Sequence, residues 1–151
     1  MPGASFFVEF DAEEVCPIQF AGDPVILLFF ISWAYSLRFG GMHELAQATM
    51  HMQRYHKVDL RPLLTFADHE VEDEDDRFAL EHAWQDAAPL AVASRAVADA
   101  LGSDDEDLHS FTKEYEPGLQ DRLRELAAMC DWGAERNARV RLSFKLEYVE
   151  E

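Results

Sequence analysis

Apolar and polar residues alternate at both ends of the chain, which is the pattern of strands with one buried face. Near the start, Phe6, Val8 and Phe10 occupy every second position. The clearest strand lies at the far end, where an apolar set alternates with a mostly basic one: Val140, Leu142, Phe144, Leu146 and Tyr148 against Arg139, Arg141, Ser143, Lys145 and Glu147. We expect the two terminal strands to pair, with Glu9 opposite a basic residue.

A nearly all-apolar stretch follows the first strand. Asp23 and Pro24 form a helix-start signal and Gly40 with Gly41 a stop signal, so we predict a buried helix over residues 24–39. A buried strand over residues 25–31 is the alternative, because an element that is apolar on every side has no diagnostic period. The stretch is too short and too interrupted by serine to span a membrane, so we interpret it as core.

Two further segments carry helical patterns. Residues 42–57 place apolar side chains at helical intervals, which predicts an amphipathic helix. Residues 77–101 are rich in alanine with larger apolar residues at helical spacing. We expect Pro89 to break this second pattern into two short helices and Gly102 to close it.

The remaining helices are predicted from their end signals. Ser103 and Glu106 match a capping box, and the acids at positions 104–107 then lie at the positive end of the following helix. Pro117 is expected to open the last helix, with Asn137 as its C-cap.

Strands at both ends with helices between them predict an α+β fold. We expect a small antiparallel sheet formed by the N- and C-terminal strands, packed against about four to six helices. The length of 151 residues suits a single globular domain over residues 1–151. A mobile acidic loop is expected near residues 67–76.

The chain is strongly acidic, with a formal net charge of −17, and its charge is unevenly distributed. Residues 67–116 hold sixteen acidic and three basic side chains. Such a field repels nucleic acid and anionic membranes, so we expect neither as a direct partner. We interpret the basic face of the last strand as neutralising the chain's own carboxylates and guarding a sheet edge, with an anion or a partner's acidic strand as the alternative.

The densest charge lies between Asp68 and Asp76, where seven of nine residues are acidic. Five of them recur at every second position: Asp68, Glu70, Glu72, Glu74 and Asp76. In an extended backbone they would form a row with a spacing of about 6.5–7 Å, which resembles a polyanion. We predict that these five residues bind a basic protein partner, although acidic runs are also typical of solvated loops.

Catalytic and metal motifs are absent from the sequence. There is no nucleophile elbow, no phosphate-binding glycine loop and no calcium-binding loop pattern. A zincin-like site would need a histidine four residues after His43, but Gln47 stands there, and His51 and His56 are expected to diverge around their helix. We therefore predict no catalytic residue, no metal ligand and no cofactor.

The two cysteines, Cys16 and Cys130, are far apart and lack metal-ligand spacing. They are expected to be free thiols in a reducing compartment, and Cys130 to be a small core residue. The N-terminus shows no secretory leader, so we expect a cytoplasmic location.

These observations favour a non-enzymatic interaction module, such as an inhibitor, an immunity-type protein or an adaptor, that presents an acidic surface to a basic partner. The alternative is a hydrolase or a small-molecule or metal-binding enzyme with a pocket of histidines and carboxylates. A third interpretation is that the acidity reflects only solubility or salt adaptation.

Overall fold

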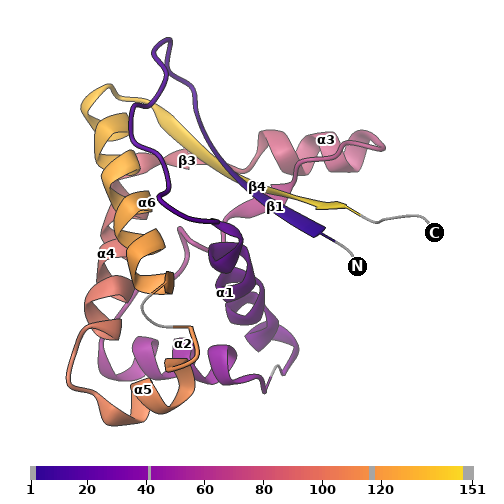
Figure 1. Cartoon of the computed structure of the whole chain (residues 1–151). Coiled ribbons are helices and arrows are strands. Elements are labelled where there is room, and N and C mark those ends of the chain that lie inside the picture. The colour runs from indigo at the N-terminus through magenta and orange to yellow at the C-terminus, as the bar shows by residue number, and fades with distance from the viewer. Residues whose placement is uncertain (1–2, 41, 116–117, 148–151) are drawn as a thin grey trace.

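The computed structural model describes residues 3–40, 42–115 and 118–147. Within these ranges the chain forms six α-helices, one 3-10 helix and four strands (Figure 1). In chain order the elements are β1 (Gly3–Phe10), α1 (Val25–Tyr35), η1 (Ser36–Phe39), α2 (Glu44–Tyr55), β2 (Phe66–Asp68), α3 (Glu74–Glu81), β3 (Trp84–Asp86), α4 (Ala87–Leu101), α5 (Glu106–Thr112), α6 (Gly118–Glu135) and β4 (Arg139–Glu147).

β4 is the central strand of the sheet. β1 runs antiparallel to it along nearly its whole length, and Glu9 lies opposite Arg141. The other edge of β4 is shared by two short strands, because β3 pairs antiparallel with residues 139–141 and β2 pairs parallel with residues 142–144. The α+β fold and the antiparallel pairing of the terminal strands are confirmed, and β2 makes the sheet mixed.

Helices cover one side of the sheet and form the core with it. In Figure 1, α3 lies at the upper right of the strands, α1, α2 and α5 lie below them, and α4 and α6 stand at the left. α4 packs closely against α6, and α2 packs against both α1 and α5. The inner face of β4 completes this core, since Val140 and Leu142 are fully buried.

The apolar stretch after β1 is helical, as its start and stop signals predict. α1 continues through η1 as far as Phe39, and Gly40 follows with a φ of 78°. Glycine adopts this left-handed conformation without steric cost, which explains why the helix ends there. The alternative of a buried strand over residues 25–31 is wrong. Among the described helices, none combines the length and apolar character needed to cross a bilayer.

The break predicted at Pro89 lies instead at β3. α3 ends at Glu81, and α4 runs unbroken from Ala87 to Leu101. Pro89 therefore occupies the first turn of α4, where backbone N–H groups have no partner within the helix and a missing N–H is tolerated. The predicted break was wrong for this reason, whereas Gly102 ends α4 as expected.

The N-cap of α5 lies two residues after Ser103, the cap that the sequence predicts. Asp105 is the cap, and its Oδ1 accepts a hydrogen bond from the backbone N–H of Leu108 at 3.1 Å. Ser103 instead accepts a hydrogen bond from the backbone N–H of Asp105. Glu106 and Asp107 occupy the first turn, so the acids of this segment do lie at the positive end of a helix.

α6 ends where the sequence predicts. Asn137 has a φ of 55°, and its N–H donates to the carbonyl oxygen of Ala134. The N–H of Ala138 reaches back to the carbonyl oxygen of Gly133, which satisfies another carbonyl of the last turn. Asn137 is thus confirmed as the cap, while the predicted start at Pro117 lies outside the described residues.

The basic face of β4 neutralises carboxylates of the same chain, as expected. The ion pairs are Arg139 with Asp11, Arg141 with Glu9, and Lys145 with Glu70. The expectation that this face guards a sheet edge is wrong, because β4 has neighbours on both edges and is not an edge strand.

Candidate functional site

The acidic run from Asp68 to Asp76 joins a strand to a helix. β2 ends at Asp68 and α3 begins at Glu74, so the backbone is not extended throughout. The expected single row of five carboxylates is therefore wrong in its geometry, because side chains two positions apart on a helix point to different faces. We call residues 68–81 the acidic arm.

Several acids of the arm have local structural roles. Asp68 accepts a hydrogen bond from the backbone N–H of Glu70 at 2.9 Å. Asp73 is the N-cap of α3 and accepts from the N–H of Asp76 at 2.8 Å. Asp76 in turn accepts from the N–H of Glu72 at 3.0 Å. These three aspartates organise the turn that leads into α3.

Other carboxylates of the arm remain available to a partner. Glu70 lies near Lys145, with 3.6 Å between Oε1 and Nζ. The carboxylates of Glu72, Glu74 and Asp75 have no hydrogen-bond or ion-pair partner among the described residues. Of the five predicted contact residues, Glu72 and Glu74 are therefore the two whose carboxylates have no partner in the part of the chain that the structure describes.

The arm also exposes apolar surface. None of the side chains of α3 is buried. The side chain of Phe78 is 63% exposed and stacks on the ring of His82, and Val71 is exposed as well. An aromatic side chain surrounded by charges is typical of protein-binding surfaces.

A second cluster joins the end of α2 to the N-cap of α5. His51 Nε2 lies 2.6 Å and His56 Nε2 lies 2.8 Å from the same oxygen, Oδ2 of Asp105. The three side chains are 13%, 23% and 20% exposed, respectively. Their ligand atoms all lie within 4.8 Å of one another, so they are residues that could hold a metal ion.

The environment of Asp105 keeps its carboxyl group ionised. The hydrogen bond from His56, the backbone N–H of Leu108 and the hydrogen bond from His51 hold the pKa of Asp105 well below its ordinary value. An ionised carboxylate only accepts hydrogen bonds, so each of the two imidazoles donates from Nε2. The arrangement links α2 to α5 through one oxygen atom.

The expectation that His51 and His56 diverge around a helix was wrong. α2 ends at Tyr55, and His56 is its C-cap. The direction of the His56 side chain is therefore not set by helical spacing, and both rings turn towards the loop before α5. His43 does not belong to this cluster, because its side chain caps the start of α2 and its ring stacks on Trp33.

A serine, a histidine and a glutamate also meet on the outer face of the sheet. Ser143 Oγ lies 3.3 Å from both His69 Nδ1 and Glu9 Oε1. A catalytic triad needs the serine and the acid on different imidazole nitrogens, but here Glu9 also approaches Nδ1, at 3.8 Å. Ser143 is fully buried as well, so we interpret the cluster as structural.

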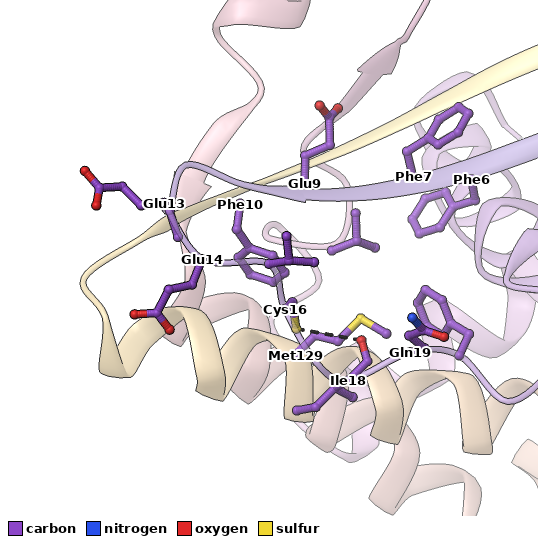
Figure 2. Close-up of a pocket in the computed structure, with 14 residues that line it drawn as sticks. Phe6, Phe7, Glu9, Phe10, Glu13, Glu14, Cys16, Ile18, Gln19 and Met129 are labelled. Carbon is purple, nitrogen blue, oxygen red and sulfur yellow. Dashed lines mark hydrogen bonds between the residues drawn. The ribbon is translucent and has the colours of Figure 1, made fainter.

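A cavity of about 580 Å³ lies between β1, the loop that follows it and α6. Figure 2 shows Phe6, Phe10, Ile18 and Met129 around it, with the carboxylate of Glu13 directed away from these apolar side chains. Among the described residues that line it, Cys16 is the only thiol and none is a histidine. The cavity offers apolar contact surface and no assembled catalytic group.

The two thiols differ in environment, which predicts different reactivity. Both are free; Cys130 is fully buried in α6, whereas Cys16 is half-buried at the cavity. Burial raises the pKa of the Cys130 thiol to about 12, so little thiolate forms near neutral pH. We expect titration of the native protein with a thiol reagent to modify Cys16 alone, and Cys130 only after denaturation. Two fast-reacting thiols, or a fast thiol that persists in Cys16→Ser, would contradict this.

Comparison of the chain with protein-family models, with curated protein sequences and with solved structures gave no match in any of the three.

Proposed function

We propose that this protein is a non-enzymatic interaction module that presents the acidic arm to a basic protein partner. The observation that carries the proposal is an eight-residue helix, α3, that buries none of its side chains and exposes Phe78 beside carboxylates that have no partner among residues 3–40, 42–115 and 118–147. An inhibitor, an immunity-type protein or an adaptor would each use such a surface. We also infer a cytoplasmic location, because free cysteines suit a reducing compartment.

The chemistry of the arm suits a partner with a basic groove and an apolar contact point. Clustered carboxylates accelerate encounter with a positive surface and select against acidic partners. Binding energy is commonly concentrated in a few large side chains, and aromatic residues are frequent among them. Phe78 supplies such a group, while Glu72, Glu74 and Asp75 supply charge without having to break an ion pair with any residue that the structure describes.

The test compares two triple variants that remove the same charge from different helix starts. The arm variant carries Glu72→Gln, Glu74→Gln and Asp75→Asn. The matched control carries Asp104→Asn, Glu106→Gln and Asp107→Asn at the start of α5. Each protein is immobilised and exposed to lysate of the source cells at about 0.1 M salt, where the screening length is about 10 Å. Bound proteins are quantified by mass spectrometry.

We expect one basic protein to be retained by the wild type and by the control, and to bind the arm variant about 10-fold less. Phe78→Ser, which keeps every charge, should weaken the same complex. The factor by which binding falls should change little with salt concentration. Equal retention by all variants would contradict the proposal. In that case the acidity is explained by solubility or salt adaptation.

A further inference from the structure

The cluster of His51, His56 and Asp105 has the composition and convergence of a metal site. Its two imidazole nitrogens and its carboxylate oxygen come from two segments about fifty residues apart, yet they meet within 4.8 Å. Two histidines and one carboxylate form a common ligand set of zinc sites that keep one coordination position open. This cluster is separate from the acidic arm and its role does not depend on the proposed function.

The distances between the ligand atoms suit a small ion. In a tetrahedral zinc site with bonds of about 2.0–2.2 Å, neighbouring ligand atoms lie about 3.4 Å apart. The separations of 2.6 and 2.8 Å from Asp105 Oδ2 to the two Nε2 atoms would have to open by less than 1 Å. Rotation of three partly exposed side chains supplies that movement without a change in the backbone.

Neighbouring groups fix the orientation of the Asp105 carboxylate. Oδ1 of Asp105 caps α5 through the N–H of Leu108, which orients Oδ2 towards the histidines. Contacts of this kind fix the geometry of metal ligands and raise affinity. The acids at positions 104, 106 and 107 are adjacent in the chain and add a negative field that concentrates cations.

We propose that His51, His56 and Asp105 bind one Zn²⁺ ion through Nε2, Nε2 and Oδ2. On binding, each imidazole carries its hydrogen on Nδ1 and donates the Nε2 lone pair to the ion, so the two hydrogen bonds to Asp105 are replaced by three metal bonds. Of the three ligands, His51 also lines a cavity of about 300 Å³, together with Arg54, Tyr55 and Phe111. The ion would also bridge α2 and α5 and stabilise their packing.

The site is tested by calorimetric titration of the full chain with Zn²⁺ after removal of bound metals. About 5 mM Mg²⁺ is present throughout, because it occupies sites made only of oxygen ligands, such as the exposed carboxylates. We expect one Zn²⁺ per chain with a Kd of about 1 μM or tighter. Co²⁺ is the second probe, since ions of low coordination number with nitrogen ligands absorb visible light far more strongly than the hydrated ion.

His56→Gln is the decisive variant, because glutamine keeps an N–H donor for Asp105 but is a poor zinc ligand. It should weaken Zn²⁺ binding at least about 100-fold and abolish the Co²⁺ bands. Asp105→Asn should do the same while retaining an oxygen that can cap α5. The matched control is His82→Gln, which alters an exposed histidine at the C-cap of α3 and should leave the affinity unchanged. Far-UV circular dichroism verifies the fold of each variant.

Two results would overturn the proposal: millimolar or non-stoichiometric Zn²⁺ binding by the wild type, or unchanged binding by His56→Gln. The cluster would then be a metal-free hydrogen-bonded link between α2 and α5. The proposed function fails or succeeds independently, since the arm variant should bind Zn²⁺ normally and His56→Gln should still bind the basic partner.

Discussion

Replacing Phe30 by alanine is expected to lower the free energy of unfolding by about 3–5 kcal/mol. Phe30 lies in α1 with 0% of its side chain exposed and belongs to the core cluster. Truncation removes the transfer free energy of the ring and leaves a cavity that a tightly packed interior fills only in part. For a chain of this size the melting temperature should fall by roughly 6–20 °C. Thermal and urea denaturation followed by circular dichroism measure both effects.

Phe29→Ala is the matched control, because it changes the same residue type at the adjacent position of α1. Phe29 is 43% exposed and contacts the rings of Trp33 and Tyr115 at the edge of the core. We expect a loss of only about 1 kcal/mol. Neighbouring side chains on a helix point about 100° apart, so equal losses for the two variants would contradict the buried face assigned to α1.

The elements that sequence reasoning located are those with strong local signals. β1 and β4 have long two-residue alternation, and α1 is bounded by start and stop signals that outweigh its missing period. The pairing of Glu9 with Arg141 was also predictable, because once the terminal strands pair, charge complementarity favours an acid opposite a basic residue.

The short strands could not be predicted. β2 and β3 have three residues each, too few to show a period. They are strands because the second edge of β4 supplies unpaired backbone groups that must be satisfied. The same tertiary effect explains why the helical pattern of residues 77–101 is interrupted before Pro89. The chain must leave the helix early to place β3 beside β4.

The acidic run and the His–Asp cluster show two different limits of prediction from sequence. Regular spacing predicted one row of carboxylates, but the N-cap signal of Asp73 starts a helix within the run and redirects the later side chains. The cluster depends on the meeting of α2 with the N-cap of α5, which no local pattern encodes. Helical spacing also misplaces His56. α2 ends at Tyr55, so the direction of the His56 side chain does not follow from its position in the helical pattern.

The second large effect is expected at Arg141, which joins three strands on the outer face of the sheet. Its guanidinium donates to Glu9 at 3.1 and 3.3 Å, lies 4.5 Å from the centre of the Trp84 ring and approaches the carbonyl oxygen of Leu80. The side chain is only 15% exposed. We expect Arg141→Met to reduce the free energy of unfolding by about 2–3 kcal/mol, between the values for exposed and fully buried ion pairs.

Methionine keeps most of the apolar stem, so the loss measures charge and hydrogen bonding more than packing. Arg139→Met is the matched control on the same strand and face. Arg139 pairs with Asp11 but is 57% exposed, so this variant should lower the free energy of unfolding by less than about 1 kcal/mol.

Combining Arg141→Met with Glu9→Gln in a double-mutant cycle should give a coupling energy of about 1 kcal/mol, measured by urea denaturation. A coupling near zero would mean that Arg141 stabilises the sheet through Trp84 and Leu80 instead. Equal losses at Arg139 and Arg141 would contradict the role assigned to burial, because the Arg141 side chain is 15% exposed and that of Arg139 is 57% exposed.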